Sequence, residues 1–88
     1  MFSVLYVGDA LVTMICHQSL DRDDPMPFHY TLHFRDVPTG KQAELACTGE
    51  NDAYMLMAAW LVADEAEIGM LEPFRARLQA ELPEGFMP

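Results

Sequence analysis

Basic residues are scarce in this sequence. Its 88 residues include 5 lysines and arginines against 14 aspartates and glutamates, which gives a formal net charge of −9. A chain with this charge repels the phosphate backbone of nucleic acids and the surface of anionic membranes. We therefore expect neither nucleic acid nor membrane as a partner, whereas a basic protein partner fits the charge.

Cysteine is also scarce. Cys16 and Cys47 are the two cysteines, and both lie among apolar residues, as is typical of buried thiols in a reducing compartment. A disulfide would require them to lie on neighbouring strands with suitable geometry, which the sequence does not specify. The apolar N-terminal residues lack a basic leader, and Gly8-Asp9 interrupts them. These features predict a cytoplasmic protein.

No apolar run is long enough to cross a membrane. The segment Ala53–Ala63, AYMLMAAWLVA, has eleven residues, and as a helix these would span about 16 Å, roughly half of a hydrocarbon core. Three acidic residues, Asp64, Glu65 and Glu67, follow almost directly. The run therefore predicts a helix of a globular protein rather than a transmembrane segment.

The length allows one domain, which we expect to fill residues 1–88. Its first half has the composition of strands. Phe2–Val7 and Ala10–Gln18 are rich in β-branched and aromatic residues, and Gly8-Asp9 between them suits a two-residue hairpin turn. The alternative, a helix over Ala10–Leu20, is disfavoured by those β-branched residues.

Strict alternation of apolar and polar residues predicts a strand over residues 28–35, FHYTLHFR, with one buried face. Residues 41–48 alternate too, and a four-residue loop, Val37–Gly40, joins the two segments. The apolar residues of both strands must share a face, and together with the four-residue loop this condition determines the register. It pairs Phe34 with Ala43, Leu32 with Leu45, Tyr30 with Cys47 and His33 with Glu44.

The second half has the pattern of two helices. The first is capped by Thr48, Asn51 or Asp52 and extends to Gly69 as the residue after its end. The second covers residues 72–82, with Pro73 in its first turn. Its expected apolar stripe is Phe74, Leu78 and Leu82, and Arg77 pairs with Glu81 one turn later.

Together these patterns predict an α+β fold. An antiparallel sheet of about four strands lies within residues 2–48, and two C-terminal helices within residues 51–82 pack on one face of it. Residues 83–88 form a tail, which is loose unless Phe86 and Met87 dock on the domain.

The first helix is apolar all round, so it needs cover on more than one side. We expect the sheet to cover Met57, Trp60 and Leu61, and the second helix to cover part of another side. The remaining surface predicts a homodimer interface near a two-fold axis, formed by Tyr54, Met55, Leu56, Ala58, Ala59 and Val62. The alternative is a monomer in which the second helix and the tail cover the first helix completely.

Polar residues on one face of the sheet are the main candidate for a ligand site: His29, Thr31, His33, Arg35 and Glu44. A carboxylate beside His33 can make a general base, or it can be a solvated ion pair. On a strand, His29 and His33 are about 13 Å apart, which is too far for one metal ion. The chain has no glycine-rich phosphate loop, and its acidic segment Asp21–Asp24 lacks the pattern of a calcium loop. We therefore expect no metal and no cofactor.

These observations favour a small, acidic, non-enzymatic interaction protein of the inhibitor, immunity or adaptor type, which acts as a homodimer through its apolar helix. The alternative is a small-molecule-binding domain, or a minor enzyme, that uses the polar face around His29, His33 and Glu44.

Overall fold

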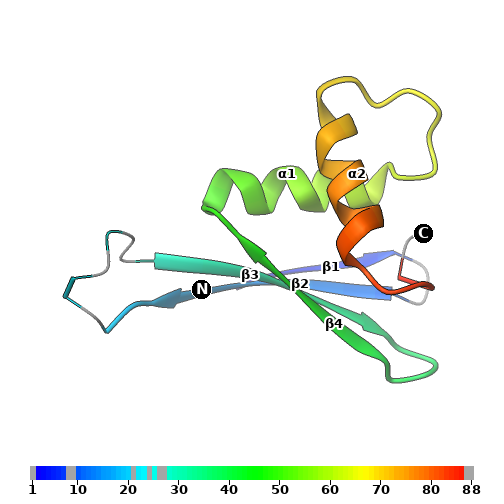
Figure 1. Cartoon of the computed structure of the whole chain (residues 1–88). Helices are drawn as coiled ribbons and strands as arrows, with labels where there is room; N and C mark the ends of the chain where they lie inside the picture. Colours follow the sequence, from blue (N-terminus) through cyan, green and yellow to red (C-terminus); the bar gives the residue numbers. More distant parts are fainter. Residues whose placement is uncertain (1, 8–9, 21, 24, 26–27, 87–88) are drawn as a thin grey trace.

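The computed structural model describes residues 2–7 (by their backbone), 10–20, 22–23, 25 and 28–86. An antiparallel sheet precedes two α-helices, so the prediction of an α+β fold with two C-terminal helices is confirmed (Figure 1). A short 3-10 helix, η1, lies directly before the last helix. The elements are β1 (Phe2–Val7), β2 (Ala10–Gln18), β3 (Phe28–Asp36), β4 (Gln42–Cys47), α1 (Glu50–Leu61), η1 (Gly69–Leu71) and α2 (Glu72–Glu81).

The sheet is a meander in which each strand pairs with the next, in the order β1-β2-β3-β4. Residues 10–18 form a strand rather than a helix, as their β-branched residues predict. Val7 pairs with Ala10, while the proposed turn residues Gly8 and Asp9 lie outside the described residues.

The register of β3 and β4 is confirmed: Phe34 pairs with Ala43, Leu32 with Leu45, Tyr30 with Cys47 and His33 with Glu44. The four predicted loop residues, 37–40, lie between the hydrogen-bonded residues Asp36 and Lys41, and β4 begins one residue later. The Asp36 N–H donates to the Lys41 carbonyl over 2.9 Å, and the Gly40 N–H donates to the Asp36 carbonyl over 2.8 Å. Gly40 has a φ of 73°, a left-handed conformation that glycine adopts at no steric cost.

Helix α1 is shorter than the sequence predicts. It starts at Glu50 after Gly49 without a side-chain cap, and it ends at Leu61 instead of extending to Gly69. Acidic residues beyond its end oppose the helix dipole, and the Arg75 guanidinium of α2 binds the carbonyls of Ala63 and Glu65 in the segment that follows. Gly69, with a φ of 59°, begins η1 instead.

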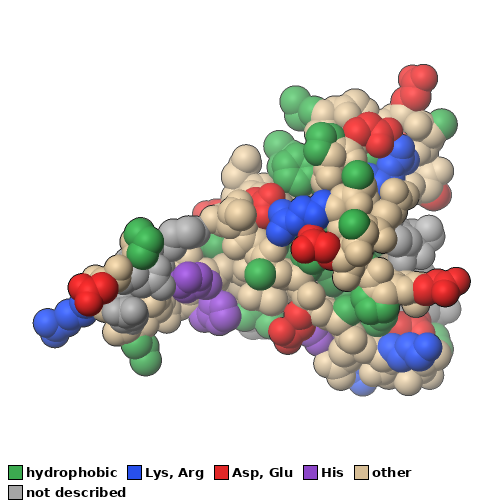
Figure 2. All heavy atoms as spheres, in the orientation of Figure 1, with side chains coloured by type: hydrophobic (Ala, Val, Ile, Leu, Met, Phe, Trp, Pro, Cys, Tyr) green, Lys and Arg blue, Asp and Glu red, His purple; other side chains and the backbone are tan. Residues whose placement is uncertain are grey.

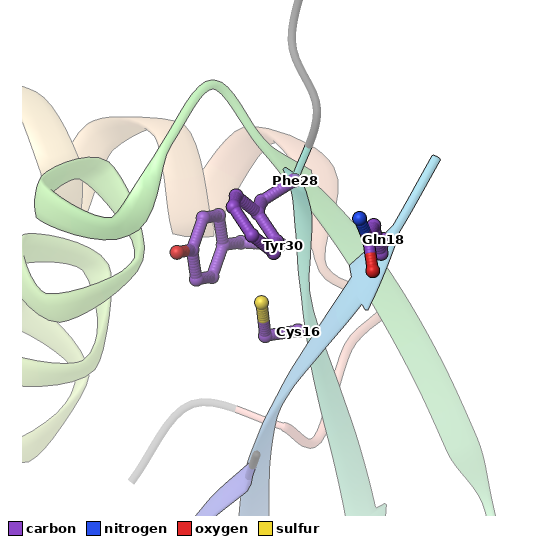
Figure 3. A pocket seen from close by; sticks show the side chains of 4 residues that line it. All are labelled: Cys16, Gln18, Phe28 and Tyr30. Atoms are coloured by element: carbon purple, nitrogen blue, oxygen red, sulfur yellow. The ribbon is translucent and has the colours of Figure 1, made fainter. Parts of the chain in front are cut away.

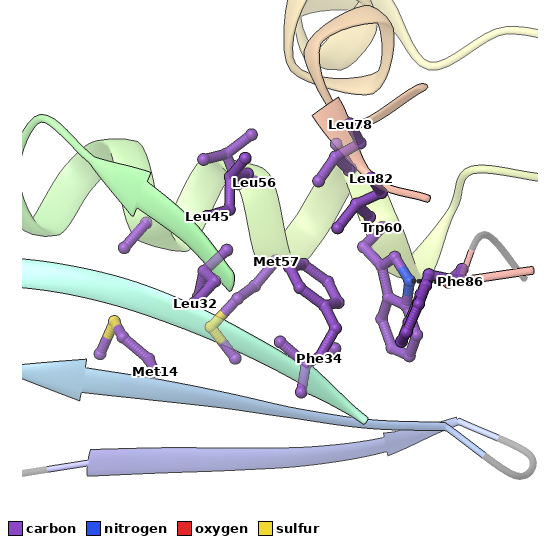
Figure 4. Close-up of a cluster of buried hydrophobic side chains, with 13 residues drawn as sticks. Met14, Leu32, Phe34, Leu45, Leu56, Met57, Trp60, Leu78, Leu82 and Phe86 are labelled. Carbon is purple, nitrogen blue, oxygen red and sulfur yellow. Dashed lines mark hydrogen bonds between the residues drawn. The ribbon is translucent and has the colours of Figure 1, made fainter. Parts of the chain in front are cut away.

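Helix α1 lies across one face of the sheet, and α2 packs against α1 on the same side (Figure 1). Trp60 is fully buried near the Phe86 end of the core, and its ring meets that of Phe34 edge-on with 6.0 Å between centroids (Figure 4). Leu61, which we expected to face the sheet, is 43% exposed, and Leu56 is buried instead. The buried residues are Val12, Met14, Leu32, Phe34, Leu45, Ala53, Leu56, Met57, Ala59, Trp60, Leu78, Leu82 and Phe86.

The tail docks on the domain through Phe86, which is only 5% exposed. The Trp60 indole Nε1–H donates to the Phe86 carbonyl over 2.9 Å, which satisfies the one polar group of an otherwise apolar side chain. Met87 lies outside the described residues. The tail and α2 therefore cover part of the apolar run. The monomer alternative requires complete cover, whereas Tyr54 and Leu61 remain exposed.

None of the described helices is both long enough and apolar enough to cross a bilayer.

Candidate functional site

The five polar residues predicted as a ligand face come together on one side of the sheet. His29, Thr31, His33 and Arg35 alternate along β3 with the core residues, and Glu44 is the β4 partner of His33. They therefore lie on the face opposite α1, which no described element covers (Figure 1). Antiparallel sheets commonly expose one such polar face to water.

The predicted pair of His33 and Glu44 does not form the contact that a general base needs. His33 Nε2 lies 2.8 Å from Oε1 of Gln42, a neutral amide, and Glu44 is exposed. A carboxylate orients and charges an imidazole when it accepts the hydrogen bond from the ring. The described contact of His33 is therefore to the neutral amide of Gln42 rather than to the predicted carboxylate of Glu44.

The sequence leaves the face of His17 open, and the structure places it opposite His29. The two rings meet edge-on with 6.1 Å between centroids, and histidines gather beside the protruding end of the sheet (Figure 2). Within the described part of the chain, no three His, Cys, Asp or Glu side chains are grouped to hold a metal ion.

A pocket that the sequence did not predict lies on the other face of the sheet. Its volume is about 420 Å³, and its lining residues come from two directly opposed pairs of β2 and β3: Cys16 with Tyr30, and Gln18 with Phe28 (Figure 3). We name this end of the sheet, residues 16–18 and 28–30, the arm. The arm extends beyond the start of α1 (Figure 1), so Gln18 and Phe28 on its inward face stay exposed, while Tyr30 packs against the core.

The tyrosine of the pocket has a shifted pKa. The Cys16 thiol raises the pKa of the Tyr30 hydroxyl, and burial and the Glu50 carboxylate raise it further. The hydroxyl is protonated at neutral pH, as that of an unperturbed tyrosine is. Elsewhere, burial and the nearby Asp52 carboxylate raise the pKa of the Cys47 thiol to about 11. Cys47 stays a thiol at neutral pH, which is the unreactive form.

The outer side of α1 is the second candidate surface. Two of the six predicted interface residues, Leu56 and Ala59, are fully buried in the core of the single chain, so their side chains are not on its surface. The other four reach the surface, and Leu61 joins them. We call these five residues the α1 stripe: Tyr54, Met55, Ala58, Leu61 and Val62.

The α1 stripe is continuous because its members recur at helical spacing. Tyr54, Ala58 and Leu61 follow at intervals of four and three residues, which places them on one side of a helix. Tyr54 is 45% and Leu61 43% exposed, and the other three are half-buried. The sequence could not separate this side from the buried one, because both are apolar.

A charged cluster at Arg77 holds the helices in place. Arg77 Nη1 donates to Asp52 Oδ2 over 2.8 Å, Nε donates to Glu81 Oε2 over 2.9 Å, and Nη2 donates to the Ala46 carbonyl over 2.6 Å. The pair with Glu81 was predicted. Burial alone would raise the pKa of Asp52, but hydrogen bonds from Arg77 and from the Thr48 N–H outweigh it and lower the pKa. This cluster joins α2 to α1 and β4, so its role is structural.

The chain matches no known protein family, and it shows no significant similarity to a curated protein or to a solved structure.

Proposed function

We propose that this chain is a small, acidic, non-enzymatic interaction protein that binds a basic protein through the α1 stripe. The observation that carries the proposal is the pair of large apolar side chains, Tyr54 and Leu61, each more than two-fifths exposed on a helix that already buries its opposite side. Contiguous exposed apolar surface marks interaction sites on small globular proteins.

Charge supports a basic partner for this surface. Glu50 lies one turn before Tyr54, Asp64 and Glu65 follow the end of α1, and all three are exposed. An apolar centre with an acidic rim complements an apolar patch with a basic rim. Self-association through α1, which the sequence predicts, would bring two acidic rims together in a chain of net charge −9. We therefore favour the basic partner.

The proposal includes a cytoplasmic location. The two cysteines are unpaired, which fits a reducing compartment, and the short apolar helix fits a protein that meets its partner in solution.

The test compares two identical substitutions of exposed leucines. Leu61→Asp places a charge in the α1 stripe, and Leu20→Asp makes the same change at a leucine that is 98% exposed and lies outside the stripe. Each tagged variant is used to capture proteins from a lysate of the cells that express the chain. We expect a basic protein bound by the wild type and by Leu20→Asp, lost with Leu61→Asp, and released by salt. Equal capture by the wild type and both variants would show that the α1 stripe is not the binding surface. A partner of acidic character would reject the charge argument.

Small-molecule binding is the second candidate, and the pocket of about 420 Å³ favours it. Its site would be Cys16, Gln18, Phe28 and Tyr30 rather than the polar face around His29, His33 and Glu44. A screen of aromatic and amide-bearing fragments, followed by amide NMR shifts, tests this candidate. Binders that shift Cys16 and Tyr30 would support it, while fragments that shift neither residue would dismiss it.

A further inference from the structure

The two edges of the sheet differ in their protection. Strand β4 forms one edge, and α2 reaches it: Arg77 donates to the backbone carbonyl of Ala46. Strand β4 also contains the charged residue Glu44. Charged residues and covering elements are the usual means by which natural sheets prevent the pairing of an edge with another chain.

Strand β1 forms the other edge, and among the described helices and strands β2 is the one that packs extensively against it. Its six residues, FSVLYV, include no charged residue and no proline. All six pair with β2, and no other described strand pairs with β1. An edge strand has a second row of N–H and C=O groups that point away from its partner. A strand of this length and composition, left at an edge, is a template for another strand.

We propose that β1 pairs antiparallel with β1 of a second copy of this chain, so that two four-stranded sheets join into one sheet of eight strands. Antiparallel pairing of identical strands is symmetric about a two-fold axis, which closes the assembly at a dimer.

The charge distribution lets a second copy occupy this edge, because two facing copies of β1 bring no like charges together. The chain has a net charge of −9, so two copies repel each other wherever carboxylates meet. Strand β1 carries no charge, and two copies can approach along it with little repulsion. The exposed acidic residues 64, 65, 67 and 72 follow α1 instead, and α1 contacts β3 and β4. The β1 edge and the α1 stripe are therefore separate surfaces, and this dimer does not depend on the proposed function.

The first experiment measures self-association by sedimentation or light scattering across a concentration series. Val4→Lys places a charge in β1, and Thr13→Lys places the same charge in β2 at the residue directly opposite. Because β2 is paired on both sides, its backbone cannot accept another strand. We expect Val4→Lys to raise the dimer Kd at least about tenfold, while Thr13→Lys stays within about threefold of the wild type.

The second experiment measures amide hydrogen exchange in β1 of the wild type, so its result does not depend on whether Val4→Lys folds. In a single chain only alternate β1 amides point at β2, so the others exchange with solvent rapidly. In the dimer that second set becomes protected in proportion to the dimer fraction. The proposal would be overturned if the wild type stays monomeric or if the outward-pointing β1 amides never become protected. It would also be overturned if both lysine variants split the dimer equally. A dimer split by Leu61→Asp alone would assign self-association to α1 and also overturn it.

Discussion

The two ends of the sheet begin with the same sequence pattern and finish in different environments. At the end near the β3–β4 loop, Phe34 lies under Trp60 and is 1% exposed; in the arm, Phe28 on the same strand and the same face is 48% exposed. Length explains the difference. The twelve residues of α1 span about 18 Å, while the nine residues of β3 span about 30 Å. One short helix cannot cover both ends, so alternation predicts which face is inward but not how much of it is covered.

We call the end near the β3–β4 loop the covered end. The largest expected effect is that of Trp60→Ala in this end. It removes the largest fully buried side chain and its hydrogen bond to the Phe86 carbonyl. We expect the free energy of unfolding to fall by about 3–5 kcal/mol, measured by urea denaturation. A loss below about 1 kcal/mol would show that the covered end is not the centre of stability.

The matched pair Phe34→Ala and Phe28→Ala makes the comparison directly. The same change is made on one strand and one face, in the covered end and in the arm. We expect a loss of about 3–5 kcal/mol for Phe34→Ala and of less than about 1 kcal/mol for Phe28→Ala. Hydrogen exchange should also be faster at the arm amides than at residues 32–34. Equal losses would mean that something covers the arm in solution.

Arg77→Gln tests the charged cluster that fixes the helices over the covered end. It leaves Asp52, whose side chain is 14% exposed, without its ion-pair partner. We expect a loss of about 1–2 kcal/mol by denaturation. Glu81→Gln is the control: its side chain is 48% exposed, and the change should cost less than about 0.5 kcal/mol. A Glu81→Gln variant as unstable as Arg77→Gln would place the stabilising contact at Glu81 instead.

The smallest expected effect is the pH dependence of this cluster. The pKa of Asp52 is lower in the folded chain than in the unfolded chain, so the folded state favours the carboxylate. Its contribution is fully present above the unfolded pKa of about 3.9 and is lost as the pH falls toward the folded pKa. The stability advantage of the wild type over Asp52→Asn should therefore be constant from pH 7 to 5 and shrink below pH 4. An advantage that grows on acidification would contradict this assignment.

The sheet could be predicted in detail because its pattern is local. The alternation in 28–35 and 41–48, with an even-numbered loop between them, determines the register of β3 and β4, and the structure has that register. Pro73 and the spacing of Phe74, Leu78 and Leu82 similarly locate α2. Leu78 is buried in the helix and Leu82 directly after its end, while Phe74 is partly buried against the core.

The end of α1 and its buried side could not be predicted, because both depend on contacts distant in sequence. Arg75 of α2 binds the carbonyls beyond Leu61, and nothing in the sequence around Leu61 predicts these hydrogen bonds. Nor does the composition of α1 distinguish Leu56, which is buried, from Leu61, which is exposed. The pocket was missed for a similar reason, since its lining residues meet only through the pairing of β2 with β3.

The docking of Phe86 also bears on how the chain folds during synthesis. Among the residues whose burial is described, the core extends from Val12 to Phe86, so the ribosome must release residue 86 from its exit tunnel before the core can close. Until then Trp60 lacks the hydrogen-bond acceptor that Phe86 provides, and exposed apolar surface on incomplete chains is what chaperones bind. Trp60, the single tryptophan of the chain, lies against Phe86, so its fluorescence reports the moment when a nascent chain completes its fold.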